Sequence, residues 1–269
     1  MKECFYKQKN IYYRVNEFRQ NRPTLVFIHG LSGSSSAWAP YEKKFFEQYN
    51  LLTFDLRGHG KSAKPKNYSD YAIKNFADDL FSLLAHLKIT NFILVSHSFG
   101  ALIALEFLAE HQAIVKAAVF LSPNFAPDER LIARAVKPLL SAAKIFKLLP
   151  SFSRPRGHVD YKNYLNTGDW NIRRLVADIY NTGLRVYLYC TRQSCQFDRK
   201  KFLSQITVPA LIIHGKKDTI FPVNRAMVMA AKIKKSRLIL LDNADHIIVL
   251  NHFPAVAEAI ANFVAAEKL

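Results

Sequence analysis

One stretch of the chain decides its fold: Asn91-Phe-Ile-Leu-Val-Ser-His-Ser98-Phe-Gly100, which runs directly into Ala101-Leu-Ile-Ala-Leu-Glu-Phe-Leu-Ala-Glu-His111. Residues 92–95 are apolar and rich in β-branched and aromatic side chains, which predicts a buried strand. Residues 101–111 carry Ala and Leu at helical spacing without Gly or Pro, which predicts a helix. Because the strand becomes a helix over so few residues, we predict that Ser98 lies at a sharp bend with a strained backbone.

The segments on either side repeat this alternation of strand and helix. Short apolar runs predict strands at residues 24–28, 51–54, 114–121, 210–213 and 237–241, and helical spacing predicts helices at 37–48, 73–87, 224–233 and 254–266. Residues 4–7 and 11–15 predict an edge hairpin. Strands that alternate with helices form right-handed crossovers and a mostly parallel sheet covered on both faces. The predicted fold class is α/β.

The alternation breaks between residues 123 and 205. Helical patterns at 129–149 and 170–189 and loops with Pro stand there, without a buried strand. We therefore predict a core of residues 1–122 and 206–269 and a helical insertion of residues 123–205, the cap, over the carboxyl edge of the sheet. Several aromatic residues of the cap either line an apolar pocket or pack the cap onto the sheet: Phe146, Phe152, Tyr161, Tyr164, Trp170, Tyr180 and Tyr187.

The chain is strongly basic. Its 269 residues include 38 Lys and Arg against 21 Asp and Glu, a formal net charge of +17, and the cap alone holds 15 basic and 6 acidic residues. Such a balance concerns solubility and anionic partners rather than fold. A basic solvated surface is the simplest interpretation, and an anionic substrate or a peripheral membrane contact is the alternative. No recognised nucleic-acid-binding motif accompanies the charge, so we do not expect a nucleic-acid partner.

The cysteines and the N-terminus point to an intracellular protein. Cys4, Cys190 and Cys195 are an odd number without metal-ligand spacing, which argues against a small, disulfide-stapled secreted domain. Residues 1–10 lack the apolar core of a signal peptide, and no apolar run is long enough to span a membrane. We expect a cytoplasmic protein without a transmembrane segment, cofactor or metal. The oligomeric state stays open.

Polar residues suited to nucleophilic catalysis follow three of the predicted strands. A serine hydroxyl is a weak nucleophile and needs a base, an orienting acid and a site for the oxyanion. Ligands of open α/β sheets bind at the carboxyl ends of the strands, so these partners should directly follow strands. The loops that qualify begin at His29, at His214, which leads to Asp218, and at Asp242, which leads to His246. In chain order the candidates are Ser98, Asp218 and His246.

These residues resemble the α/β-hydrolase family, whose members carry nucleophile, acid and His in this order. Residues 96–100 resemble the G-x-S-x-G nucleophile elbow, with Ser96 where the first Gly usually stands. Four further motifs resemble the family: His29-Gly30 its oxyanion loop, Asp55-Leu-Arg-Gly-His-Gly-Lys-Ser62 its D-x-R-G-x-G-x-S loop, Gly215-Lys-Lys-Asp218 its G-x-x-D motif, and His246 with Pro254 its His loop and following helix. The match covers nearly the whole chain except the cap. It implies an α/β-hydrolase fold with an inserted helical cap.

The resemblance also implies a mechanism. His246 would act as base for Ser98 and Asp218 as orienting acid, and the backbone N–H groups of Phe99 and Leu31 would form the oxyanion hole. Family members that open epoxides or cleave carbon–halogen bonds use Asp at the elbow, so Ser98 argues against both. We expect hydrolysis of a small-molecule ester or thioester, which the basic cap would allow to be anionic. Hydrolysis of an amide or carbon–carbon bond, and a non-catalytic ligand-binding protein, are the alternatives.

Other residues near the predicted strand ends are weaker candidates. Asp242 and Asp245 adjoin His246 in sequence and are badly placed to orient its ring, while the loop after the strand at 114–121 reads Ser122-Pro-Asn124 and holds no carboxylate. We do not expect any of four other histidines to act as the base. His29 and His59 stand in loops that the family uses structurally, His97 should point away from Ser98 into packing or a hydrogen bond, and His252 is too close to the last helix.

Overall fold

The computed structural model describes residues 1–127 and 156–268. At its centre lies an eight-stranded sheet with the strand order β1-β2-β4-β3-β5-β6-β7-β8. The strands are β1 (Lys2–Tyr6), β2 (Ile11–Val15), β3 (Thr24–Ile28), β4 (Asn50–Phe54), β5 (Phe92–His97), β6 (Val115–Leu121), β7 (Ala210–Gly215) and β8 (Ser236–Leu241). Strands β3 to β8 pair in parallel, and the hairpin β1–β2 joins antiparallel to β4. The predicted hairpin and mostly parallel sheet are confirmed.

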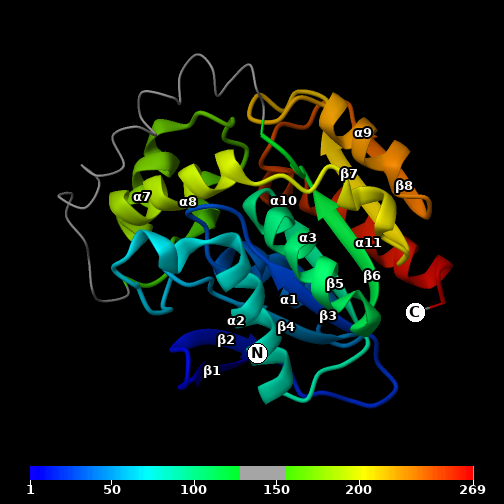
Figure 1. Ribbon diagram of the computed structural model, residues 1–269, viewed down its shortest axis with the longest axis horizontal. Coiled ribbons are helices and arrows are strands. Elements are labelled where there is room, and N and C mark those ends of the chain that lie inside the picture. Colours follow the sequence, from blue (N-terminus) through cyan, green and yellow to red (C-terminus); the bar gives the residue numbers. More distant parts are fainter. Residues whose placement is uncertain (128–155, 269) are drawn as a thin grey trace.

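Helices cover both faces of the sheet, as Figure 1 shows. On one face pack α2 (Ile73–His86), α3 (Phe99–His111) and α9 (Asn224–Lys232), and on the other α1 (Ala39–Phe45) and α11 (Phe253–Ala266). Within β3, Val26 and Ile28 belong to the hydrophobic core on the α2 and α3 face of the sheet. Leu25 and Phe27 belong to the core on the α1 and α11 face. A strand that is apolar on both sides is what burial on two faces requires.

The described part of the cap contains α7 (Ile172–Thr182) and α8 (Leu184–Gln196). Both lie at the end of the sheet toward which the parallel strands point (Figure 1). The single helix predicted at 170–189 is wrong, because Gly183 breaks it with a φ of 95°, a conformation that glycine adopts without strain. The helix predicted at 129–149 lies outside the described residues, so the division into core and cap stays a prediction.

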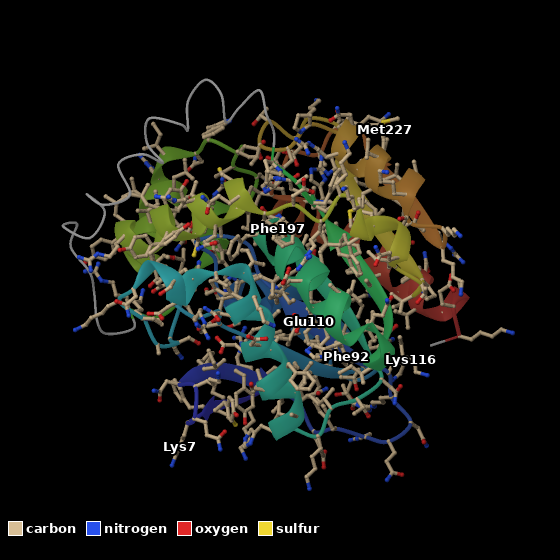
Figure 2. The ribbon with its side chains drawn as sticks, viewed as in Figure 1. Lys7, Phe92, Glu110, Lys116, Phe197 and Met227 are labelled. Atoms are coloured by element: carbon tan, nitrogen blue, oxygen red, sulfur yellow. The ribbon has the colours of Figure 1, made fainter. Side chains whose placement is uncertain are left out.

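The cap returns to the core across α3. The backbone N–H of Arg199 donates to the carbonyl of Phe125, which brings the two ends of the cap together at 2.8 Å. The Arg199 guanidinium makes two parallel hydrogen bonds of 2.8 Å to the carboxylate of Glu106 in α3. Phe197 is buried beside them, over α3 (Figure 2). Bidentate pairs of this kind fix orientation as well as adding energy, so this contact anchors the end of the cap.

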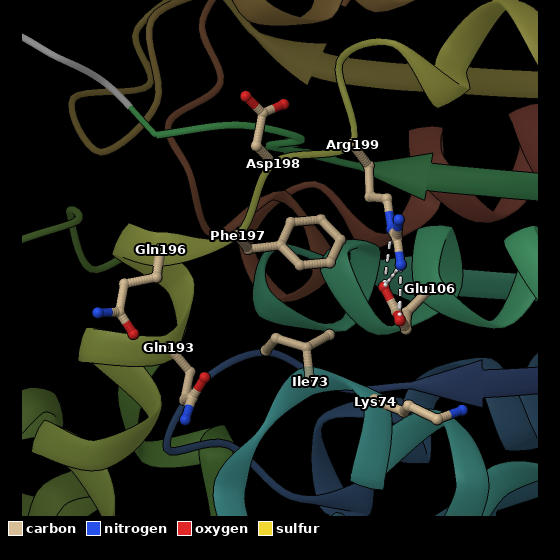
Figure 3. A pocket seen from close by; sticks show the side chains of 8 residues that line it. All are labelled: Ile73, Lys74, Glu106, Gln193, Gln196, Phe197, Asp198 and Arg199. Carbon is tan, nitrogen blue, oxygen red and sulfur yellow. Dashed lines mark hydrogen bonds and ion pairs between the residues drawn. The ribbon is translucent and has the colours of Figure 1, made fainter.

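A surface hollow of about 260 Å³ lies at this anchor (Figure 3). Three of its four charged residues form ion pairs, Arg199 with Glu106 and Lys74 with Glu110 at 2.8 Å, while Asp198 accepts from the backbone N–H of Lys200. None of its lining residues lines the separate pocket beside Ser98. Within residues 1–127 and 156–268, no helix is long and apolar enough to cross a bilayer.

Candidate active site

Ser98 lies at the bend between β5 and α3, and its backbone is strained as predicted. Its φ of 52° and ψ of −114° are unusual for a residue other than glycine, a state that costs roughly 1–3 kcal/mol. Two residues later, the chain runs close to the end of β3. A Cβ atom on Gly100 would lie 2.7 Å from the carbonyl oxygen of Ile28, so only glycine fits there. The surrounding sheet and helix thus hold the strained serine in place.

Ser96 stands where the family resemblance places a glycine, and its side chain has a partner in the sheet. The buried hydroxyl donates to the carbonyl oxygen of Val119 in β6 at 3.1 Å. A buried hydroxyl without a partner would be destabilising, but this one is satisfied by the neighbouring strand. The departure from the glycine pattern therefore leaves no unpaired polar group under the bend.

The structure brings Ser98, His246 and Asp218 together from three different loops. The Ser98 Oγ atom lies 2.8 Å from Nε2 of His246, which follows β8. The His246 Nδ1 atom lies 2.7 Å from Oδ2 of Asp218, which follows β7. With its Nδ1–H donating to the carboxylate, the ring leaves Nε2 free to accept the serine proton. The predicted base and acid thus both stand within hydrogen-bonding reach of their partners.

Asp218 is held as a carboxylate by donors on both of its oxygens. Its Oδ1 accepts from the backbone N–H groups of Ile220 at 2.8 Å and Phe221 at 2.7 Å, while Oδ2 faces His246. Burial by itself raises the pKa of Asp218, but the bond from His246 and the backbone donors outweigh it, so the pKa lies below its usual value. Asp218 is therefore ionised at neutral pH and suited to stabilise a positive charge on His246.

His97 has the hydrogen-bonding role that was predicted, but its ring does not point away from the site. Its Nε2–H donates to the carbonyl oxygen of His246 at 3.0 Å, and the two ring centroids lie 5.2 Å apart. Burial, followed by the nearby His246, lowers the pKa of His97 to about 3. A general base works best with a pKa near the operating pH, so His97 is a poor one and serves to support the His246 loop.

His29 and His59 are also neutral structural residues. The Nδ1–H of His29 donates to the Gly30 carbonyl at 2.8 Å, and its Nε2 accepts from the Leu56 N–H at 3.0 Å. Burial lowers the pKa of His29 to about 4 and that of His59 to about 3. Both ring nitrogens of His29 are occupied in binding the backbone of two loops, which leaves it no free group for chemistry.

The two residues predicted to supply the oxyanion hole stand at the pocket beside Ser98. Leu31 and Phe99 both line it. Within the described residues, neither backbone N–H has a hydrogen-bond partner. The N–H of Phe99 is free because it opens α3, where the first donors of a helix have no partner within the helix. Unpaired donors beside a nucleophile can accept a developing negative charge.

The pocket beside Ser98 has a volume of about 320 Å³ and is built from both core and cap. Of the aromatic residues singled out in the cap, Tyr161, Trp170 and Tyr187 line it. Tyr180 lies exposed instead. Tyr164 packs against the hydrophobic core on the α1 and α11 face, and Phe146 and Phe152 fall outside the described residues. The cap thus supplies part of the pocket wall, and the aromatic residues divide between lining and other roles.

Two polar residues of the cap reach the site region without having been predicted. Asp169 accepts a hydrogen bond of 2.7 Å from the backbone N–H of His246. His158 donates from Nε2 to the buried carboxylate of Asp55 at 2.7 Å. Each contact joins residues far apart in sequence, so no local spacing could indicate it. The one available signal is compositional, since the basic cap contains few carboxylates and Asp169 is among them.

The site offers no metal-binding cluster in the part of the chain that the structure describes, where no group of three His, Cys, Asp or Glu side chains could hold an ion.

Comparison with known proteins places the chain in a family. Residues 23–253 match the model of the alpha/beta hydrolase fold. The chain belongs to the α/β-hydrolase family. It is 25% identical over 279 residues to the proline iminopeptidase of Saccharolobus solfataricus, covering 95% of this chain and 89% of that protein.

Solved structures with the same fold superpose over almost the whole chain. An α/β-hydrolase enzyme from a Medee basin deep-sea metagenome library gives a TM-score of 0.79 at 22% identity and covers 98% of this chain and 97% of its own. The enol-lactonase of Burkholderia xenovorans gives 0.73 at 21% identity, with 95% and 96% covered. The α/β-hydrolase fold predicted from the sequence is thereby confirmed.

Proposed function

We propose that the protein is a serine hydrolase that cleaves a carboxylic ester or thioester through an acyl-enzyme on Ser98. One observation carries the proposal: the Ser98 hydroxyl lies 2.8 Å from His246, whose other ring nitrogen lies 2.7 Å from Asp218. A nucleophile bonded to a base that a third group orients is the signature of covalent catalysis. Membership of the α/β-hydrolase family supports it.

In the acylation step, Ser98 Oγ attacks the substrate carbonyl carbon while His246 Nε2 accepts the hydroxyl proton. Asp218 keeps the proton on Nδ1 and stabilises the imidazolium that forms. The carbonyl oxygen becomes an oxyanion within reach of the free N–H groups of Leu31 and Phe99. Each such donor is worth on the order of 3 kcal/mol in the transition state. His246 then passes its proton to the leaving group as the carbon–oxygen or carbon–sulfur bond breaks.

Water completes the cycle. His246, neutral again, removes a proton from a water molecule that attacks the acyl carbon on Ser98. Collapse of the second tetrahedral intermediate returns the proton to Ser98 and releases the acid. The strained backbone at Ser98 favours this chemistry because it presents the hydroxyl at the end of the sheet, directly in front of the N-terminus of α3.

The pocket supports a small-molecule substrate with an apolar portion. Its exposed walls are mainly apolar and include Trp38, Leu102 and Leu175, and its polar residues include the buried Arg174 and Asp178. Pockets of this composition bind small molecules, with the polar groups fixing orientation. An amide substrate is the second candidate, favoured by the resemblance to a proline iminopeptidase, and the same nucleophile would serve it.

The test compares two serines of the same bend. Purified wild type, Ser98→Ala and Ser96→Ala are incubated with a fluorophosphonate probe and assayed with p-nitrophenyl acetate and butyrate. We expect Ser98→Ala to lose the label and to lose about 10⁴-fold or more in kcat. Ser96→Ala should keep both, because its hydroxyl binds Val119 and not the site.

Two results would overturn the proposal. Undiminished turnover in Ser98→Ala would remove Ser98 as nucleophile, and a wild type that neither takes up the probe nor hydrolyses any ester, thioester or amide would identify a non-catalytic binding protein. Parallel assays with p-nitrophenyl butyrate, an acyl thioester and prolyl p-nitroanilide separate ester, thioester and amide hydrolysis by the ratio of kcat/KM.

A further inference from the structure

Asp169 is a buried carboxylate of the cap that binds both loops carrying the partners of Ser98. Its Oδ1 accepts from the backbone N–H of His246 at 2.7 Å. Its Oδ2 accepts from the backbone N–H of Thr219 at 2.9 Å and from the Thr219 hydroxyl at 2.7 Å. Thr219 directly follows Asp218. One carboxylate from the cap thus joins the base and the acid through their backbones.

Trp170, the residue next to Asp169, also binds Thr219. The indole Nε1–H of Trp170 donates to the Thr219 hydroxyl oxygen at 2.9 Å, while that hydroxyl donates its own proton to Asp169. Trp170 and Asp169 both line the pocket beside Ser98. The loop after β7 is therefore fixed from the cap side by two consecutive residues, in addition to its own bonds to Asp218.

Asp169 is itself held by the start of α7. The Arg174 guanidinium donates from Nη2 to the carbonyl oxygen of Asp169 at 2.7 Å. Asn171 caps α7, since its side-chain oxygen accepts from the backbone N–H of Arg174 at 2.9 Å. A side-chain cap stabilises the first turn of a helix, so the carboxylate extends from a fixed point of the cap.

We propose that Asp169 is a positioning residue, which sets the His246 loop and the Asp218 loop in the register that their bond to each other and to Ser98 requires. The inference rests on the proposed function. The Asp169 carboxylate accepts hydrogen bonds from three donors at once. Neither a neutral amide nor a water-exposed group can accept this set of hydrogen bonds. Catalytic groups displaced by about 1 Å lose on the order of 10²-fold in rate, so such positioning acts on kcat.

The test replaces the carboxylate by its amide. In Asp169→Asn the single amide oxygen can accept on one side only, while the NH₂ group opposes the N–H of either His246 or Thr219. We expect kcat for p-nitrophenyl butyrate to fall on the order of 10- to 100-fold while KM changes little. Asp160→Asn is the matched control, because Asp160 is an exposed cap carboxylate that bonds only locally, to the N–H of Lys162.

A second pair of variants tests the same contact from the opposite partner. Thr219→Val removes the hydroxyl and keeps the shape of the side chain, whereas Thr219→Ser restores the hydroxyl. We expect the valine variant to lose kcat and the serine variant to recover most of it. A general loss of structure would not produce this difference in kcat between the valine and the serine variant. Equal kcat values for Asp169→Asn and Asp160→Asn would overturn the inference.

A measurement that needs no activity keeps this result separate from the proposed function. Amide hydrogen exchange of the His246 and Thr219 N–H groups should be faster in Asp169→Asn than in Asp160→Asn, with exchange in β3 and β5 unchanged. Unchanged exchange at both amides would reject the positioning role even in an inactive protein. An inactive wild type with the expected exchange would instead reject the proposed function alone.

Discussion

Two Asp–His pairs, each with a buried carboxylate, stand at the carboxyl end of the sheet, and they have nearly the same local geometry. Asp218 and His246 lie 2.7 Å apart, and so do Asp55 and His158. Each carboxylate also accepts two backbone N–H bonds, from Ile220 and Phe221 in Asp218, and from Ser35 and Lys61 in Asp55. Burial raises the pKa of both carboxyls, but hydrogen bonds to the ionised form outweigh it and lower them.

The difference lies in what the histidine joins. His246 comes from the core and presents its second nitrogen to Ser98 at 2.8 Å. His158 comes from the cap, so its bond to Asp55 ties the cap to the loop after β4. The neighbouring Val159 adds a second tie, since its carbonyl accepts from Ser36 at 2.9 Å. An Asp–His pair therefore has no catalytic meaning by itself, and the third group decides whether it serves chemistry or assembly.

Removing the charge of the first pair should have the largest effect. Asp218→Asn keeps the size of the side chain but offers the wrong hydrogen-bonding group to Nδ1 of His246. We expect kcat/KM for p-nitrophenyl butyrate to fall about 10⁴-fold, with the fold retained by circular dichroism. Asp242→Asn is the control, since this exposed carboxylate precedes His246 in the same loop and pairs with Lys216. Similar losses in both variants would contradict the assignment.

Removing the histidine of the second pair should act on stability rather than on chemistry. His158→Ala removes one of the two donors to Oδ2 of the buried Asp55, leaving the Lys61 N–H as the other, and a hydrogen bond to a charged group contributes about 1.5–3 kcal/mol. We expect the free energy of unfolding in urea to fall by that amount. The loss of kcat should be far smaller than in Asp218→Asn. His158→Gln, whose amide can still donate, should recover part of the stability.

The pH dependence of stability should reveal the two carboxylates together. Both have a folded-state pKa below the unfolded value, so the unfolded chain binds more protons in acid and each contribution is present above the unfolded pKa of about 3.9. It is lost as the pH falls through the folded pKa, by at most about 1.4 kcal/mol per pH unit for each carboxyl. Urea unfolding between pH 7 and pH 3 measures this slope. Asp55→Asn and Asp218→Asn should each flatten it, and a slope unchanged in both would contradict the pKa shifts.

Much of the core followed from local patterns. The predicted strand at 24–28 coincides with β3, and the bend at Ser98 has the strained backbone that its short strand-to-helix connection requires. The helix break at Gly183 was missed because an isolated glycine is compatible with a helical pattern, and only its φ of 95° ends the helix. The orientation of His97 was also wrong, since the position of its ring depends on the His246 carbonyl, which lies 149 residues further along.

The sequence by itself determined the sheet, the order of Ser98, Asp218 and His246 along the chain, and their places after strands, because apolar periodicity and turn residues act over a few neighbours. Only the tertiary structure decided which of the many polar residues meet. Asp169 reaches His246 across 77 residues, and His158 reaches Asp55 across 103. Such bonds form where packing brings two loops within about 3 Å of each other, and no spacing along the chain encodes that distance.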